Sequence, residues 1–175
     1  MIVTVTLRTA RREDIHLIEH WLRTDHVRRF WGEPEKNARL FRRPPPGVRS
    51  AIIMDDEREI GIVVWQHPIR QELDEAGLSE IPETVIDIDI MIGELDAVGR
   101  GIGPAAIKQV VDEALTDPSV PFVMAAVSVE NRASCRALMK AGFQIEREFD
   151  DVPGGRHMLM IRRREHPGDE GRSMP

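Results

Sequence analysis

Two carboxylates alternate with isoleucines in the stretch TVIDIDIMIG, residues 84–93, where they could act together on a ligand. Isoleucine at positions 86, 88, 90 and 92 predicts a buried strand face, because alternate residues of a strand point to opposite sides. Asp87, Asp89 and Met91 then share the other face and point toward whatever binds beside the strand. A solvated polar face is the structural alternative, and the pattern by itself leaves both interpretations open.

The strand leads directly into a glycine-rich loop, VGRGIGP, that precedes a predicted helix. Gly99, Gly101 and Gly103 let a ligand approach the main chain closely. Amides at a helix N-terminus suit a phosphate or diphosphate, Pro104 fits the first helical turn, and Arg100 adds positive charge. The loop lacks the Gly-Lys-Ser/Thr ending of a P-loop, and its glycines have the wrong spacing for the dinucleotide fingerprint. A tight connection and an anion site both remain open.

Acidic residues accumulate between Gln71 and Gly99, a stretch without Lys, Arg or His. An ammonium–carboxylate contact at about 4 Å is worth about 4 kcal/mol at an effective dielectric near 20, before desolvation is subtracted. The stretch could therefore attract a polycation, and a solvated acidic loop is the alternative for each residue. Its carboxylates are Glu72, Asp74, Glu75, Glu80, Glu83, Asp87, Asp89, Glu94 and Asp96.

The composition is that of one acidic globular domain. The 175 residues are 41% hydrophobic, which is enough for a core of its own. A formal net charge of −6 argues against nucleic acid as the partner and suits a cationic small molecule. The single cysteine, Cys135, excludes an internal disulfide. The sequence shows neither a signal-peptide pattern nor an apolar run of membrane-spanning length, so we expect a cytoplasmic protein.

Hydrophobic periodicity predicts the elements that position these residues. Strands are predicted over 3–10, 84–92 and 121–129, and hairpins over 50–67 and 144–163. Helices are predicted over 11–23, 26–32, 33–43, 103–115 and 132–143. This order indicates a mixed α/β fold with a central, partly parallel sheet. We expect one domain over 1–164 and a disordered tail over 165–175.

Two motifs in this order resemble the GCN5-related N-acetyltransferase (GNAT) family. The family's acyl-CoA diphosphate loop reads roughly R/Q-x-x-G-x-G/A, and Gly101-Ile102-Gly103 supplies the G-x-G, with Val98 at the usual Arg or Gln position. The segment ENRASCRALMKAGF resembles the family segment whose asparagine, here Asn131, contacts the CoA arm. Within the family, most of residues 4–163 resembles aminoglycoside 6′-N-acetyltransferases, and the loop 68–84 has no match.

The resemblance implies a GNAT fold, in which a mixed, mostly antiparallel sheet of six to seven strands is splayed around acetyl-CoA. About four helices would flank this sheet. Acetyl-CoA would be the co-substrate, and no metal is implied. The residues implied to contact it are Ile90, Met91, Ile92, Val98, Gly99, Arg100, Gly101, Ile102, Gly103, Pro104 and Asn131.

The resemblance also assigns catalytic roles. Asp89 falls on the carboxylate that acts at the attacking amine, with Asp87 assisting. A carboxylate can bind the ammonium and then accept or relay its proton, but a pKa of about 3.9 must first be raised by burial, or water must carry the proton. A main-chain amide within 90–92 would stabilise the oxyanion. Leu138 occupies the position of the tyrosine that protonates the leaving thiolate, and the chain contains no tyrosine.

For the acceptor, the resemblance favours the 6′-amine of an aminoglycoside. Trp31 matches a ring that lines the family's acceptor site, although core packing is its alternative. Ala126 and Gly154 stand where carboxylates would be expected around such a substrate. The alternatives are another amine (a siderophore hydroxylamine, a polyamine or a protein N-terminus) and a non-catalytic acyl-CoA sensor, which Leu138 favours. We expect no nucleic-acid or membrane partner, and a monomer or homodimer.

Three further features of the sequence do not by themselves indicate a function. HLIEH, with His16 and His20, fits a zinc pattern but has no third ligand. Cys135 lies on a predicted helix without a partner base and is interpreted as a packing residue. The arginines 39, 42 and 43 either meet the 3′-phosphate of CoA or have no ligand.

Overall fold

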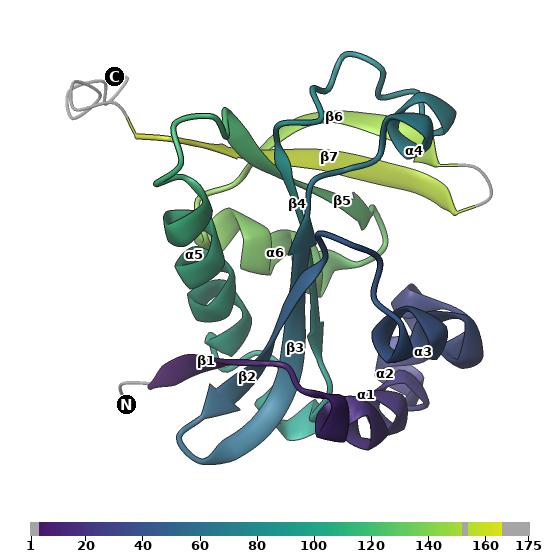
Figure 1. Ribbon diagram of the computed structural model, residues 1–175, viewed down its shortest axis with the longest axis vertical. Coiled ribbons are helices and arrows are strands. Elements are labelled where there is room, and N and C mark those ends of the chain that lie inside the picture. Colours follow the sequence, from purple (N-terminus) through teal and green to yellow (C-terminus); the bar gives the residue numbers. More distant parts are fainter. Residues whose placement is uncertain (1–3, 152–153, 166–175) are drawn as a thin grey trace.

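The computed structural model describes residues 4–151 and 154–165, so the expected tail falls almost wholly outside the described residues (Figure 1). The strands are β1 (Val5–Thr9), β2 (Arg49–Asp55), β3 (Arg58–Gln66), β4 (Ile86–Ile92), β5 (Phe122–Ser128), β6 (Gln144–Asp151) and β7 (Gly155–Arg163). The α-helices are α1 (Ile15–Leu22), α2 (Asp25–Trp31), α3 (Pro34–Arg42), α4 (Arg70–Glu75), α5 (Ile102–Ala114) and α6 (Arg132–Lys140). Short 3-10 turns cover Arg12–Asp14 and Leu95–Ala97.

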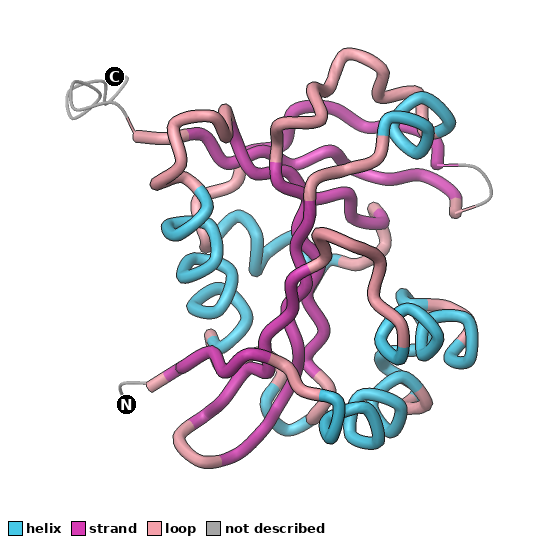
Figure 2. The backbone as a smooth tube through the Cα atoms, in the orientation of Figure 1, coloured by secondary structure: helices cyan, strands magenta, loops and turns pink. Residues whose placement is uncertain are grey.

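All seven strands form one sheet in the order β1-β2-β3-β4-β5-β7-β6. Every neighbouring pair is antiparallel except β4 and β5. That parallel pair is registered only at Ile86↔Val123 and Asp87↔Met124, after which the two strands separate (Figures 1 and 2). The predicted mixed, mostly antiparallel and splayed sheet is therefore confirmed.

Helices cover both faces of the sheet, and alternation along the strands decides which side chains they bury. On β2, Ile53 packs in the cluster beneath α5 and α6, whereas its neighbour Ile52 packs in the cluster beneath α1–α3. On β4, Ile88 joins the first cluster and Met91 the second. The predicted isoleucine face is thus correct, and α1–α3 cover only the Met91 end of the opposite face.

The segment 68–84 contains α4, a helix that the sequence patterns do not predict. Leu73, Leu78 and Ile81 are buried there against Phe149 and Leu159 of the β6–β7 hairpin. A helix of six residues is too short to show a helical period, which explains why it was missed. The described chain therefore has six α-helices, more than the four or so expected.

No helix in residues 4–151 or 154–165 is long and apolar enough to cross a bilayer.

Gly61 makes the close pairing of β3 with β4 possible, and we expect Gly61→Ala to be strongly destabilising. A Cβ at this position would lie 2.2 Å from the main-chain oxygen of Met91, which cannot move without disturbing the sheet. Overpacking typically costs about 1–3 kcal/mol and occasionally more, and so close an approach to a main-chain atom belongs at the upper end. Urea unfolding should show the loss. Gly103→Ala is the control, because its added Cβ would meet nothing closer than 3.8 Å; equal stability of the two variants would contradict the prediction.

Candidate active site

The separation of β4 from β5 opens two adjoining pockets. We call the first, of about 410 Å³, the acidic pocket; Asp89 lies in its wall. The second, of about 330 Å³, contains the glycine loop at residues 99–104 and is called the loop pocket. Five residues line both pockets and so mark the junction between them: Phe30, Trp31, Ile90, Asn131 and Ser134. The sheet therefore holds one continuous cleft with two compartments.

The two compartments carry opposite charge. Among the described residues, the charged or titratable side chains that line the acidic pocket are Glu72, Asp89 and His157. Those that line the loop pocket are His26, Arg136 and Lys140. One compartment thus suits a cation and the other an anion, and the two ligands would meet at the junction.

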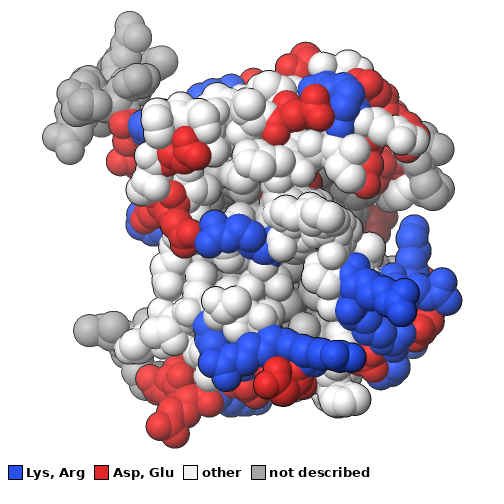
Figure 3. Space-filling model, viewed as in Figure 1, with Lys and Arg blue, Asp and Glu red and all other residues white. Residues whose placement is uncertain are grey.

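Tertiary structure pairs five of the nine carboxylates of the acidic stretch with arginines and leaves four without an ion pair. Arginines pair with Asp74, Glu80, Glu83, Glu94 and Asp96. Figure 3 shows basic and acidic side chains next to one another over the region of α4. By contrast, Glu72, Glu75, Asp87 and Asp89 form no ion pair with any described residue, and Glu75 accepts a hydrogen bond from Gln71 instead. Of these, Glu72 and Asp89 line the acidic pocket and remain available to a cation there.

Burial changes the proton affinity of this group. It raises the pKa of Asp89 to about 6, although water can still reach the side chain through the pocket. Burial also raises the pKa of Asp87 well above its usual value, and the charges of Asp89 and Glu72 raise it further. A carboxyl group near pH 6 is a better proton acceptor for an amine than an ordinary aspartate.

The glycine loop presents unpaired main-chain amides to the loop pocket. Gly99 and Gly101 have φ angles of +81° and +83°, which explains glycine at both positions. Gly103 has no such angle, and its missing Cβ would meet only Ala137 and Ile90 at 3.8 and 3.9 Å, so protein packing does not require glycine. Within the described chain, the amides of residues 99–103 have no acceptor. This cradle fits a diphosphate at the N-terminus of α5.

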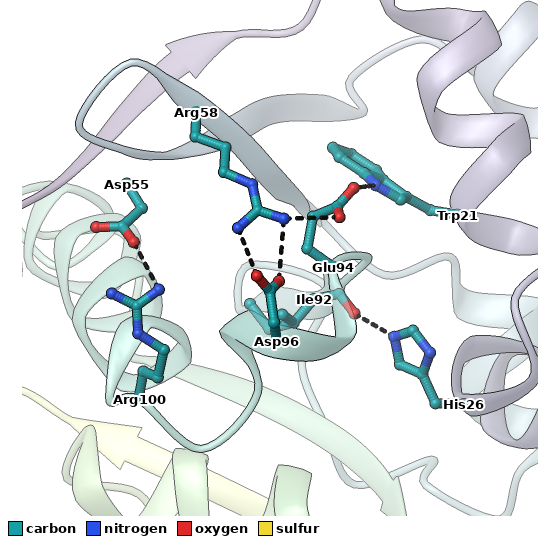
Figure 4. A network of polar contacts seen from close by, with 8 residues as sticks. All are labelled: Trp21, His26, Asp55, Arg58, Ile92, Glu94, Asp96 and Arg100. Carbon is teal, nitrogen blue, oxygen red and sulfur yellow. Dashed lines mark hydrogen bonds and ion pairs between the residues drawn. The ribbon is translucent and has the colours of Figure 1, made fainter.

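Ion pairs on the far side of the loop hold it in place and divert Arg100 (Figure 4). The Arg100 guanidinium lies 3.0 Å from Asp55 of β2, and the side chain does not line the loop pocket. Arg58 binds Asp96 and Glu94, and Glu94 accepts a hydrogen bond from the indole of Trp21. Arg100 therefore does not give the pocket the charge expected from the sequence.

The backbone of β4 faces the gap at alternate residues. His26 of α2 contacts the main-chain oxygen of Ile92 at 3.0 Å, from the side away from β3 (Figure 4). In an antiparallel pair, the NH and CO groups of one residue point to the same side and alternate along the strand. Ile90 and Ile92 therefore direct their amides toward the gap, whereas Met91 directs its main chain to β3 and its side chain, 2% exposed, into the core.

The remaining predicted residues line one or both pockets. Asn131 caps α6 by accepting a hydrogen bond from the amide of Ser134 at 3.1 Å, so its oxygen already has a structural role. Trp31 packs against Phe41 and lines both pockets. Leu138 is 2% exposed and contributes only an apolar surface to the acidic pocket. Val98 lines the loop pocket with a half-exposed side chain.

The sequence patterns did not identify five charged or titratable residues that line the cleft: Glu72, His157, His26, Arg136 and Lys140. Glu72 lies in the unmatched segment 68–84, and no local pattern marks the others. The described residues contain no group of three or more His, Cys, Asp or Glu that could hold a metal ion. Cys135 is buried, and burial raises the pKa of its thiol, in keeping with the packing role. Arg42 is paired with Glu19 and Glu35.

Comparison with known proteins agrees with this architecture. Residues 10–151 match the acetyltransferase (GNAT) domain family. Aminoglycoside N(6′)-acetyltransferases type 1 from Klebsiella pneumoniae and Serratia marcescens are each 22% identical over 170 residues, which cover 93% of this chain and 84% of theirs.

Solved structures share the fold. The aminoglycoside acetyltransferase AAC(6′)-Ib in complex with coenzyme A superposes with a TM-score of 0.79 at 22% identity, covering 92% of this chain and 95% of that one. The aminoglycoside N(6′)-acetyltransferase from Legionella pneumophila gives 0.69 at 18% identity, with 92% of each chain covered. With its splayed sheet, its amide cradle and a family match over most of its length, the chain belongs to the GNAT family and is an acetyl-CoA-dependent N-acetyltransferase.

Proposed function

We propose that the enzyme acetylates a primary amine of a small polycationic molecule, with the 6′-amine of an aminoglycoside as the first-choice acceptor. The observation that carries this proposal is the position of Asp89, a carboxylate with a pKa of about 6 in the acidic pocket beside the junction with the amide cradle. The names of the relatives from Klebsiella and Serratia support the choice of acceptor.

Acetyl-CoA supplies an acetyl group activated as a thioester, and the chain positions both reactants. The amides of the glycine loop, residues 99–103, bind the diphosphate. The amides of Ile90 and Ile92, which face the gap, are placed to donate hydrogen bonds to the carbonyl oxygen as negative charge develops on it. Trp31 and Phe30 exclude water at the junction.

The acidic pocket orients the amine and removes its proton. Glu72 attracts ammonium groups into the pocket and Asp89 binds the reacting one, while Asp87 assists from the same strand face. As the nitrogen attacks, Asp89 accepts its proton directly or through a water molecule. Leu138 cannot protonate the leaving sulfur, so the thiol leaves unassisted or takes its proton from water.

A panel of acceptors tests the proposal by measuring thiol release. A matched pair of aminoglycosides, one with an amine and the other with a hydroxyl at the 6′ position, is the sharpest comparison. We expect turnover with the amine and a rate at least about 100-fold lower with the hydroxyl, because the oxygen nucleophile gives Asp89 no ammonium to bind. Polyamines, hydroxylamines and peptides complete the panel.

Other outcomes of this panel would replace the acceptor or the activity. Turnover restricted to polyamines, hydroxylamines or peptide N-termini would assign a different amine, an alternative in keeping with Ala126 on the pocket wall where a carboxylate was expected. Acetyl-CoA binding without turnover on any amine would indicate a sensor, the alternative that the apolar Leu138 favours.

A further inference from the structure

One face of α6 contributes two cations to the loop pocket. Ala133, Arg136, Ala137 and Lys140 all line it, at spacings of three and four residues that place them on one side of the helix. Neither Arg136 nor Lys140 forms an ion pair with a described residue, whereas Lys108 on α5 is bound to Asp112. These two positive charges are therefore available to a ligand in the pocket.

The order of residues along α6 gives these charges a position relative to the diphosphate cradle. The helix begins at the junction, where Asn131 and Ser134 lie. Ala137 is opposite the cradle, since its Cβ is 3.8 Å from the place a Cβ of Gly103 would take. Lys140 ends the helix about 9 Å beyond Ser134 at 1.5 Å per residue. The two cations thus lie beside and beyond the cradle, on the side away from the transfer junction.

A ligand group of matching charge exists at that end of coenzyme A. Beyond its diphosphate the molecule continues to a ribose whose 3′-hydroxyl carries a phosphomonoester with a charge of about −1.5 to −2 at pH 7. Arg42, one of the three arginines that the sequence offers for this phosphate, is paired with Glu19 and Glu35, and Arg100 of the glycine loop is paired with Asp55. Basic side chains also gather over α3 in Figure 3, but Arg39 and Arg43 do not line the loop pocket.

We propose that Arg136 and Lys140 bind the 3′-phosphate of coenzyme A and so select it over dephospho-coenzyme A. This inference rests on the proposed use of the loop pocket for acetyl-CoA.

Calorimetric binding of coenzyme A and dephospho-coenzyme A tests the proposal without turnover. The variants are Arg136→Gln/Lys140→Gln and, as a matched control, Arg132→Gln, which removes a charge from the same helix but lines neither pocket. We expect the wild type to bind coenzyme A about 10–100-fold more tightly than the dephospho form, as hydrogen bonds between charged groups imply. The double variant should bind the two ligands within about threefold of each other, and the control should keep the wild-type ratio.

Salt supplies an independent measurement. Because the proposed contacts are electrostatic and partly exposed, the wild-type preference should shrink between about 50 mM and 500 mM NaCl. The ratio in the double variant should stay flat over the same range.

The failures can be told apart. If the wild type binds neither ligand, the proposed function falls and this inference with it. If it binds both equally well, the cradle stands but the 3′-phosphate assignment is overturned. If the double variant loses the same factor for both ligands, Arg136 and Lys140 serve the diphosphate, which also overturns the assignment.

Discussion

Asp89→Asn lowers kcat/KM for amine acetylation by about 10²–10⁴-fold, the usual contribution of a positioned proton acceptor. Asparagine keeps the size of the side chain but can neither hold an ammonium by charge nor accept its proton. In the wild type, kcat/KM should fall tenfold per pH unit below about 6, because Asp89 must be ionised in the free enzyme and its pKa is about 6. The variant should lose this acid limb. Thiol-release rates between pH 5 and 8 measure both effects.

Asp87→Asn is the matched control, since Asp87 lies on the same strand face but does not line the acidic pocket. We expect a smaller loss, about tenfold or less, from weaker attraction of the substrate. The Asp89 limb should remain near pH 6, because the pKa of Asp89 is raised by burial. If the two variants lose equal activity and both keep the limb, Asp89 is not the proton acceptor.

The same Asp89→Asn variant should be more stable than the wild type above pH 6, which separates loss of chemistry from loss of folding. Burial raises the folded-state pKa from 3.8 to about 6, so between these values the folded enzyme holds more protons than the unfolded chain. The free energy of unfolding of the wild type therefore falls as pH rises through this window. Thermal unfolding should give the variant a higher melting temperature than the wild type at pH 8. This difference should become smaller as the pH falls through 6 toward 4.

Gly103→Val should weaken acetyl-CoA binding by about 100-fold while the protein stays folded. The branched side chain would extend into the loop pocket at the amide cradle and occupy the space of the diphosphate. Outside the adjoining backbone, no protein atom lies closer than 3.8 Å to its Cβ, so the protein itself can accommodate the change. Losing one or two charge-assisted amide contacts, at about 1.5–3 kcal/mol each, accounts for this magnitude. Calorimetric titration with acetyl-CoA gives the dissociation constant.

Two controls make the Gly103 result specific. Ala105→Val adds the same kind of side chain further along α5, outside the residues that line the loop pocket, and should leave the dissociation constant within about threefold. Gly103→Ala should raise the free energy of unfolding by about 0.5–1 kcal/mol, because the position is helical and alanine has less freedom in the unfolded chain. Tight acetyl-CoA binding by Gly103→Val would mean that the diphosphate lies elsewhere.

Local sequence patterns determined the strands, most of the helices and the type of loop. Alternating isoleucines identified β4 and its two faces, since side chains alternate on any strand whatever its neighbours are. Glycines before a proline and an apolar helix marked the loop at the start of α5 for equally local reasons. These features depend on a few consecutive residues, so one chain is enough to predict them.

Tertiary structure alone decided which charged groups remain available in the cleft. Glu80 is neutralised by Arg147, which lies 67 residues away, and Trp21 binds Glu94 across 73 residues. Arg100 pairs with Asp55, which lies on a distant strand of the sheet. Glu72 comes close enough to Asp87 to raise its pKa because α4 packs over the β6–β7 hairpin. Strand register and helix packing bring such partners together, and no pattern of neighbouring residues encodes them. The sequence thus supplied the acids, the glycines and the strand, and folding determined which charges were paired and where the two pockets meet.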